Sequence, residues 1–305
     1  MSAPLVRTVD PTYILTGNLI TLRWFGHERA QAASRMTMLR NLFRRTPAAT
    51  RPAEVPPGAA VYAIGDIHGR LDLLEELLRQ VAEDAARHPA DTERRLVFLG
   101  DYVDRGGASR AVIDRLLEDP LPGFKTVYLM GNHEEAMLDF VLDRSDGLDW
   151  LSFGGLETLL SYDVPVKRLP NTPAATAELR ELLAERMPAA HIDFLRRCRL
   201  SHDAGDYVFV HAGVRPGVSM DQQDSRDLLW IRDEFLRSRA PLPGKVVVHG
   251  HTICDLPQDL GARINIDTGA FASGRLTCLV LRGTGRRFLM TIERGAPSGE
   301  LAEAR

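Results

Sequence analysis

Five segments of the 305-residue chain share one pattern, in which a short apolar run ends beside glycine at a residue that can bind a metal ion or a phosphate. The segments read VYAIGDIHG, LVFLGDYVDRG, VYLMGNHE, YVFVHAG and VVVHGH. Their candidate metal ligands are Asp66, His68, Asp101, Asn132, His211 and His251. Carboxylate, imidazole and amide donors without a thiolate favour Mn²⁺, Fe²⁺, Zn²⁺ or Ni²⁺. Six donors exceed what one ordinary zinc ion needs, so the pattern predicts a pair of ions that share Asp101.

A pair of metal ions about 3.5–4 Å apart stabilises both the attacking and the leaving oxygen of a phosphoryl displacement. Hydrolysis of a phosphate ester is therefore the chemistry that the six donors predict. A single aspartate after a strand more often caps a helix or forms a turn. That plainer alternative does not account for five such segments in one chain.

The apolar runs are the elements that must position these donors. Residues 61–64 and 246–248 are apolar at successive rather than alternate positions, which is typical of a strand that is buried on both faces. Glycine after each run lets the backbone turn sharply, so that a neighbouring side chain projects beyond the sheet. Ligands of open α/β sheets bind outside the strand ends. We therefore expect buried strands whose ends meet at one site.

These motifs resemble the phosphoprotein phosphatase family of metallophosphoesterases. The resemblance rests on GDIHG at 65–69, GDYVDRG at 100–106 and GNHE at 131–134, followed by HAG at 211–213 and HGHT at 249–252. It extends from about residue 61 to about residue 289 and is greatest with bacterial and phage-type members. It implies an α/β fold of the calcineurin-like type, a β-sandwich flanked by helices.

The resemblance also implies that the six donors divide between two divalent metal ions. Asp66 and His68 would bind the first ion, Asn132, His211 and His251 the second, with Asp101 shared. Mn²⁺ is the expected metal, and Fe, Zn or Ni are alternatives because similar ligands accept several ions. The implied nucleophile is a hydroxide that bridges the two ions and attacks phosphorus directly.

Four further residues receive roles from the same resemblance. His133 resembles the general acid that protonates the leaving alkoxide, and Asp104 would orient its ring. Arg105 would bind the phosphate through two parallel hydrogen bonds, and Arg232, in DLLWIRDEF, resembles a second phosphate-binding arginine.

Two of these roles have a plainer alternative. Asp104 could form an ion pair with Arg105 on the surface, where such pairs contribute little. Arg232 could do the same, because three acidic residues lie near it in the sequence. They are Asp227, Asp233 and Glu234.

The expected function is a metal-dependent phosphoprotein phosphatase whose partner is a phosphorylated protein or peptide. Phosphoserine and phosphothreonine are the family's usual substrates. Phosphotyrosine stays open because Met130 stands where the family commonly has arginine. One alternative is a dinucleoside polyphosphate hydrolase of the diadenosine tetraphosphatase type, although the intact GDYVDRG motif favours the phosphatase. The other is a catalytically inactive phosphopeptide-binding module.

Charge divides the chain into a basic leader and an acidic body. Residues 1–57 contain eight arginines, no lysine and three acidic residues, a formal charge of +5, whereas the whole chain carries −3. The acidic body lacks the electrostatic surface that nucleic-acid binding requires, so that partner is excluded. We expect a disordered leader and linker at 1–57, a catalytic domain at 58–294 and a flexible tail at 295–305.

The leader has two interpretations. Residues 38–45, MLRNLFRR, form a short basic amphipathic stretch that could contact an anionic membrane surface. Disorder is preferred, with Met36 or Met38 as an alternative start of the natural protein. The chain shows no secretory signal and no run of about twenty apolar residues that could span a membrane. The cysteines are three and widely separated, which predicts free thiols and a cytoplasmic protein.

Between the third and fourth motifs the pattern becomes helical. We expect helices at 133–143, 149–163 and 176–199, and an insertion at about 144–200 that forms a helical cap over one edge of the site. The Gly154-Gly155 pair is interpreted as a plain helix-breaking turn in preference to a bend that faces the substrate. Strands are expected at 263–266, 276–281 and 288–292, and they should complete the second sheet.

Overall fold

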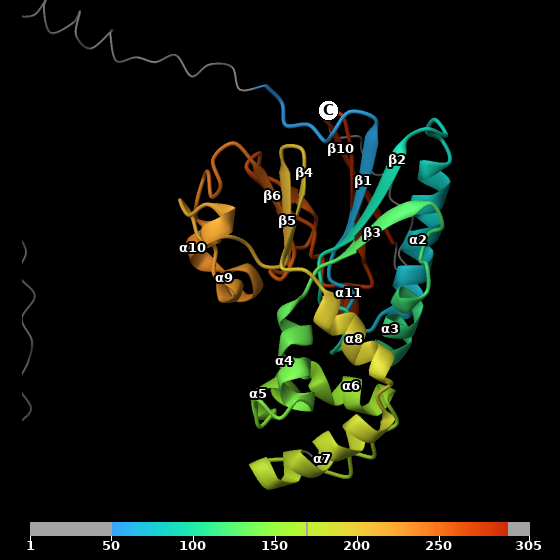
Figure 1. Ribbon diagram of the computed structural model, residues 1–305, viewed down its shortest axis with the longest axis vertical. Coiled ribbons are helices and arrows are strands. Elements are labelled where there is room, and N and C mark those ends of the chain that lie inside the picture. Colours follow the sequence, from blue (N-terminus) through green and yellow to red (C-terminus); the bar gives the residue numbers. More distant parts are fainter. Residues whose placement is uncertain (1–50, 169, 292–305) are drawn as a thin grey trace, which may run out of the picture. The chain divides into compact units, whose positions relative to one another are not determined.

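Three of the apolar runs form neighbouring parallel strands in the computed structural model (Figure 1). They are β1 (Ala59–Ile64), β2 (Glu93–Phe98) and β3 (Phe124–Tyr128). The register pairs Ile64 of β1 with Phe98 of β2, and Phe98 with Tyr128 of β3. The carboxyl ends of these strands are therefore level, and the three motifs that follow them start at the same edge of the sheet.

The structure describes residues 51–168 and 170–291, and the described residues from Pro52 onward belong to one compact unit. Most of the predicted leader and the predicted tail at 295–305 lie outside the described residues. Val55, which the sequence places in the linker, is only 1% exposed, and its amide donates a hydrogen bond to the carbonyl of Gly283 at 3.1 Å. Packing against the domain thus begins before residue 58.

The last two strands complete the first sheet, so the prediction that they complete the second sheet is wrong. Strand β9 (Thr277–Arg282) pairs antiparallel with β1, and β10 (Gly285–Met290) pairs with β9, which gives the order β10-β9-β1-β2-β3. All six residues of β1 are buried, so the main-chain groups on the side away from β2 need a partner inside the protein. Strand β9 supplies that partner, which hydrophobic periodicity alone does not identify.

The second sheet contains the two remaining motif strands. Its strands are β4 (Ser201–Ala204), β5 (Tyr207–Val210), β6 (Val246–His249), β7 (Gln258–Asp259) and β8 (Arg263–Asn265), in the order β4-β5-β6-β8-β7. Strands β5, β6 and β8 are parallel. His211 and His251 therefore follow the carboxyl ends of adjacent strands.

The two sheets pack face to face and are flanked by helices, which confirms the fold that the family resemblance implies (Figure 1). Apolar side chains from both sheets meet between them, among them Val61 and Phe209. Helices α2 (Leu71–Ala85) and α3 (Ser109–Leu117) cover the outer face of the first sheet, whereas α9 (Ser225–Trp230) and α10 (Asp233–Leu236) pack on the second. Helix α2 buries leucines three and four residues apart, the spacing that places them on one face.

The predicted helical insertion lies beyond the lower ends of the strands in Figure 1. It follows α4 (Asn132–Val141) and contains α5 (Leu148–Trp150), a π-helical turn η1 (Leu151–Gly155), α6 (Leu156–Ser161), α7 (Pro173–Arg186) and α8 (Ala189–Arg197). Two short helices lie elsewhere, η2 (Met220–Gln222) and α11 (Ala270–Ser273). Thr172 caps the N-terminus of α7, because its hydroxyl accepts a hydrogen bond from the amide of Ala175 at 3.3 Å.

The predicted helix at 149–163 is interrupted at Phe153 and Gly154, whose backbone angles are not helical. Gly154 has a φ of 125°, and a Cβ atom at this position would lie 2.8 Å from Cγ and N of Arg105. The interpretation of this glycine pair as a plain helix-breaking turn is therefore incomplete. The backbone at Gly154 packs directly against one of the candidate site residues.

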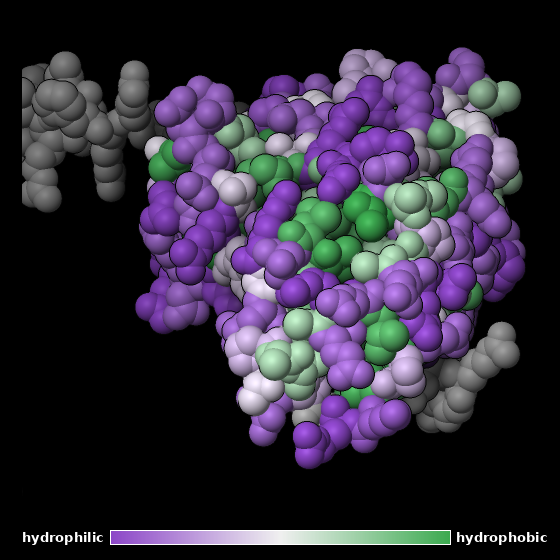
Figure 2. All heavy atoms as spheres, turned by 60° about the horizontal axis from the view of Figure 1, so that its bottom comes forward, coloured by the Kyte–Doolittle hydropathy of each residue, from purple (hydrophilic) through white to green (hydrophobic). Residues whose placement is uncertain are grey.

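Polar side chains cover most of the face in Figure 2, and apolar side chains gather there in a hollow near its centre. In the described part of the chain, no helix is long and apolar enough to cross a membrane.

Candidate metal centre

Five of the ten candidate site residues have a left-handed backbone although none of them is glycine. They are His68, Asp101, Asp104, Arg105 and His251, with φ between 47° and 73°. This conformation is uncommon for residues with a side chain, and it persists where the surrounding structure enforces it. The strand ends are therefore held in a conformation that the sequence alone does not favour.

Glu134, the last residue of the GNHE motif, enforces part of this geometry. Its carboxylate is completely buried and accepts hydrogen bonds from the amides of Asp101 (2.8 Å), Tyr102 (2.7 Å), Val103 (3.2 Å) and Gly131 (3.0 Å). A carboxylate that accepts several amide hydrogen bonds holds its loop rigidly. Glu134 thus ties the second motif to the third, a role that sequence analysis did not assign.

The structure brings the six candidate metal ligands together in the interior. None is more than 7% exposed. Donor atoms of Asp101, His211 and His251 lie within 4.8 Å of one another, and so do those of His68, Asp101 and His133. Asp101 belongs to both groups, which is the position expected of a shared ligand.

The two remaining ligands join the same cluster. The Asn132 Oδ1 atom lies 2.9 Å from Nε2 of His211 and 2.8 Å from Nδ1 of His251, and these two nitrogens are 3.2 Å apart. Asp66 Oδ2 accepts a hydrogen bond from the amide of His251 at 2.9 Å. The second ion would be held where the Asn132 oxygen and the two imidazoles converge.

The electrostatics of the cluster fit a bound cation. Burial, followed by the charges of Asp267 and Asp101, raises the pKa of Asp66, and burial lowers the pKa of His211 to about 3. The imidazoles are thus neutral and keep a lone pair for a metal ion. Among the described residues, Asp66 Oδ1 and His251 Nε2 are buried without a hydrogen-bond partner. Buried polar atoms without partners are rare, and ligation of a metal ion explains the unpaired oxygen of Asp66.

His133 and Asp104 form a buried pair beside these ligands. The His133 Nδ1 atom lies 2.7 Å from Asp104 Oδ2, and the same carboxylate accepts hydrogen bonds from Trp150 Nε1 (2.9 Å) and Thr158 Oγ1 (2.6 Å). Asp104 is completely buried. This environment excludes the alternative of an exposed ion pair between Asp104 and Arg105.

Burial disfavours charge on both members of the pair. It raises the pKa of Asp104 to about 7, although the hydrogen bonds from Thr158 and Trp150 oppose the rise. Burial and the charges of Arg105 and Arg232 lower the pKa of His133 to about 3. Because Nδ1 faces Asp104, Nε2 is the nitrogen that faces the cluster, 3.8 Å from Asp101 Oδ2.

Arg105 is held at the centre by three contacts. Its Nη1 lies 3.0 Å from Nε2 of His68, its guanidinium carbon lies 4.8 Å from the ring centroid of Phe271, and its amide donates to the Gly154 carbonyl at 3.1 Å. Stacking on an aromatic face orients a guanidinium without neutralising its charge. The guanidinium of Arg105 is therefore positioned to bind an anion at the cluster.

Arg232 remains available to a ligand. In the described part of the chain the three nearby carboxylates pair with other arginines: Asp227 and Glu234 with Arg215, at 2.7 and 3.2 Å, and Asp233 with Arg237 at 2.7 Å. The charge of Arg232 lowers the pKa of His133, His211 and His251. The alternative of a local ion pair is wrong, and Arg232 lies within electrostatic reach of the cluster.

Sequence analysis missed Asp267, which is 2% exposed and close enough to raise the pKa of Asp66. Its Oδ1 accepts a hydrogen bond from the amide of Gly269 at 2.9 Å. The segment INIDTG shows the same pattern as the five motifs, an apolar run followed by aspartate and then glycine. That signal could have identified it.

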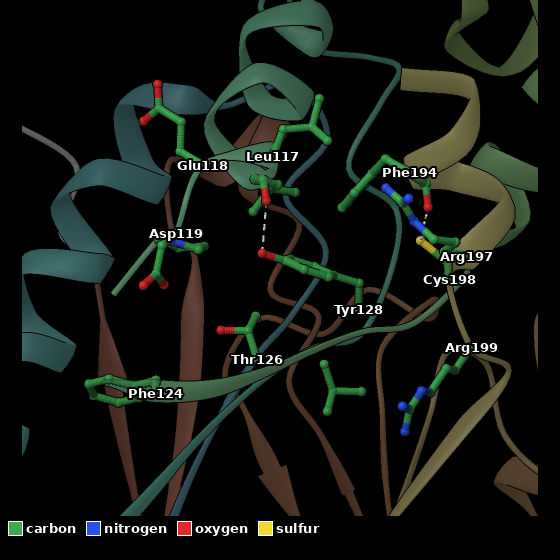
Figure 3. Close-up of a pocket in the computed structure, with 13 residues that line it drawn as sticks. Leu117, Glu118, Asp119, Phe124, Thr126, Tyr128, Phe194, Arg197, Cys198 and Arg199 are labelled. Carbon is green, nitrogen blue, oxygen red and sulfur yellow. Dashed lines mark hydrogen bonds between the residues drawn. The ribbon is translucent and has the colours of Figure 1, made fainter. Parts of the chain in front are cut away.

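A hollow of about 560 Å³ lies away from this centre (Figure 3). It is formed by β3, the end of α3 and the end of α8, and its lining includes Thr126, Tyr128 and Arg199. None of the ten candidate site residues lines it. The metal-type donors gather at the strand ends, so the chemistry is assigned there.

The fold and the clustered donors define a metal-dependent phosphoesterase. Residues 59–264 match the calcineurin-like phosphoesterase family. The chain belongs to this family, which confirms the resemblance that the motifs suggest. Members of the family use two divalent metal ions, and the two donor groups that share Asp101 provide for them.

Relatives of two kinds are similar to the chain. It is 31% identical over 225 residues to serine/threonine-protein phosphatase 2 of Salmonella typhimurium, across 71% of this chain and 90% of that protein. It is also 31% identical over 233 residues to an asymmetrical bis(5'-nucleosyl)-tetraphosphatase of Anoxybacillus flavithermus, across 71% of this chain and 88% of that protein.

A solved structure shows the same fold. It is a crystal structure of a protein provisionally described as a diadenosine tetraphosphatase, with a TM-score of 0.51 and 22% identity over 78% of this chain and 98% of that chain.

Proposed function

We propose that this protein is a phosphoprotein phosphatase that hydrolyses phosphate monoesters of serine and threonine. The observation that carries the proposal is the buried contact of 2.7 Å between His133 Nδ1 and Asp104 Oδ2, at the edge of the metal-type cluster. A serine or threonine alkoxide is a poor leaving group and must receive a proton as the ester bond breaks. A positioned acid is less important when the leaving group is a nucleotide phosphate, which leaves as a stable anion.

Six side chains at the centre would bind the two metal ions. Asp66 and His68 would hold one metal ion and Asn132, His211 and His251 the other, with Asp101 between them. When bound, the ions supply an activated water and neutralise charge on the phosphate. Mn²⁺ is the ion that we propose.

Arg105 and Arg232 would bind the phosphate oxygens, since guanidinium groups match them geometrically. His133 would act as the acid in its charged form, in which Nε2 gives a proton to the leaving oxygen. The Asp104 carboxylate orients the ring through Nδ1 and favours the positive charge that burial disfavours. Phe271 and the Gly154 carbonyl hold Arg105 in place. This chain's contribution is thus binding, orientation and one proton transfer at a defined atom.

A dinucleoside polyphosphate hydrolase is the second candidate, because a relative of the same identity is named as one. Hydrolysis of a phosphoserine peptide, a phosphotyrosine peptide and diadenosine tetraphosphate by metal-stripped protein, with Mn²⁺ added back, separates the candidates. We expect manganese-dependent release of phosphate from the phosphoserine peptide. Turnover of the nucleotide alone would overturn the proposal, and no turnover of any substrate would favour an inactive phosphopeptide-binding module. The cytoplasmic location inferred from the cysteines stays a prediction.

A further inference from the structure

A pocket of about 220 Å³ opens beside the metal centre. It lies among α4, α5, the turn η1 and the end of α9, and we call it the acidic pocket. The side chains that matter for its chemistry are Glu135, Asp139, Asp146, Asp149, Phe153 and Trp230.

Two aromatic rings connect the acidic pocket with the centre. The ring centroid of Phe153 lies 4.9 Å from that of His133, and the ring centroid of Trp230 lies 6.3 Å from that of His251. The two aromatic rings are themselves 6.3 Å apart. A substrate with its phosphate at the cluster would therefore place a neighbouring group against Phe153 and Trp230.

The pocket is negatively charged. Among the residues that the structure describes, four carboxylate side chains line it, and no arginine, lysine or histidine does. Within the described ranges only Asp139 has a basic partner, Arg144 at 3.5 Å. Glu135 accepts a hydrogen bond from the indole of Trp230 at 2.7 Å, and Asp146 accepts one from the amide of Leu148 at 3.0 Å. Both donors are neutral, so the two carboxylates keep their negative charge.

Trp230 adds an aromatic surface that favours a cation. It is 38% exposed although it is large and apolar, and its hydrogen bond to Glu135 fixes the plane of the indole. A guanidinium or ammonium group is attracted to the face of tryptophan, and carboxylates beside the ring strengthen that attraction. The same carboxylates repel a chain of phosphates.

We propose that the acidic pocket binds the arginine or lysine side chain of a residue close to the phosphorylated residue of a protein substrate. The inference rests on the proposed function and narrows it to phosphoproteins with basic sequence around the phosphate. Phe153 and Trp230 form the wall between the two subsites, and Glu135 and Asp149 supply negative charge within the acidic pocket.

The test compares three phosphoserine peptides that differ only in the residues beside phosphoserine, which are arginine, alanine or glutamate. Because each exposed charge pair contributes a modest amount, we expect kcat/KM to be about tenfold higher for the arginine peptide than for the glutamate peptide. The double variant Glu135→Gln/Asp149→Asn should bring the three peptides to within about twofold of one another. Raised salt should have the same effect on the wild type.

Two controls separate specificity from general damage. para-Nitrophenyl phosphate has no flanking residue, so its kcat/KM should be the same for the double variant and the wild type. Asp119→Asn removes a carboxylate from the distant hollow of Figure 3 and should leave the peptide preference unchanged. The charge reversal Asp149→Lys should move the preference towards the glutamate peptide.

The outcomes distinguish the two proposals. Hydrolysis of all three peptides at equal rates by the wild type would overturn the acidic pocket as a specificity site and leave the phosphatase proposal standing. Retention of the arginine preference by the double variant would also overturn it. Turnover of diadenosine tetraphosphate without turnover of any peptide would overturn both.

Discussion

Trp150 donates its indole N–H to the carboxylate of Asp104, with Nε1 2.9 Å from the Oδ2 atom that also lies 2.7 Å from Nδ1 of His133. The two residues are 46 positions apart in the sequence, and Trp150 is supplied by the helical insertion. The insertion is therefore more than a cover over the site. It takes part in orienting the proposed general acid.

The indole N–H should matter more for turnover than for substrate binding. Trp150→Phe keeps an aromatic ring against Phe140, 4.9 Å away, but removes the hydrogen bond to Asp104. We expect kcat to fall about tenfold with little change in KM, because Asp104 would lose a hydrogen bond that helps it to orient His133. Tyr128→Phe removes a hydroxyl hydrogen bond far from the centre and is the matched control. Steady-state kinetics with an unchanged kcat for Trp150→Phe would contradict the role.

Two variants should distinguish the loss of metal binding from the loss of acid catalysis. Asp66→Asn weakens a candidate ligand, whereas His133→Ala removes the proposed acid. We expect His133→Ala to lower kcat by about 10²–10⁴-fold with little change in KM and to keep its bound metal. Asp66→Asn should lose both turnover and metal content, measured by mass spectrometry of the metals. Full metal content in Asp66→Asn would remove Asp66 from the ligand set.

Metal ions should also stabilise the folded protein, because the donors come together only in the folded chain. At a concentration about a hundredfold above the dissociation constant, an ion adds about 2.7 kcal/mol to the free energy of unfolding. Thermal unfolding of metal-stripped protein should therefore shift to higher temperature when Mn²⁺ is added. The shift should be much smaller for Asp66→Asn, and an equal shift in both proteins would indicate binding elsewhere.

Much of this centre could be predicted because its donors follow strand ends directly. A residue such as Asp101 is placed by the strand before it and by the glycine beside it, and both are visible in the sequence. Asp267 carries the same signal and could have been found in the same way.

Other contacts depend on how distant segments pack. Trp150 reaches Asp104, and Phe271 reaches Arg105, only after the insertion and the last strands have folded onto the sheets. Neither residue lies in a local pattern that distinguishes it from an ordinary core aromatic. The position of β9 beside β1 is of the same kind, since it is set by the main-chain partners that a buried strand edge needs.

The close approach of Gly154 to Arg105 predicts a kinetic effect of a single methyl group. Gly154→Ala would strain a backbone with φ of 125° and place Cβ 2.8 Å from Arg105. We expect a loss of about 1 kcal/mol or more in the free energy of unfolding and, because Arg105 must move, a raised KM for phosphopeptide. Gly123→Ala has a φ of 87° with no atom within 4 Å, so it carries a similar backbone strain without the contact. Equal KM values in the two variants would show that the methyl group does not disturb Arg105.

Ionised Asp84 should stabilise the folded protein, and this stabilisation should be lost in acid. It is 4% exposed and accepts hydrogen bonds from the hydroxyl of Tyr62 at 2.8 Å and from Arg287. Burial alone would raise the pKa of Asp84, but the hydrogen bonds from Arg287 and Tyr62 outweigh it and leave the pKa below its usual value. Because the folded pKa lies below the unfolded one, this stabilisation is complete above the unfolded pKa, about 3.9, and is lost as the pH falls through the folded value.

The variant Asp84→Asn isolates this contribution from that of the other carboxylates. The difference in melting temperature between wild type and variant should be largest near pH 7, where Asp84 is ionised, and should shrink as the pH falls below about 4. Asp91→Asn, at an exposed position, should show no such dependence. Thermal unfolding followed by circular dichroism across this range gives the comparison. A constant difference between wild type and Asp84→Asn at every pH would mean that the loss comes from packing and that the charge of Asp84 contributes nothing to stability.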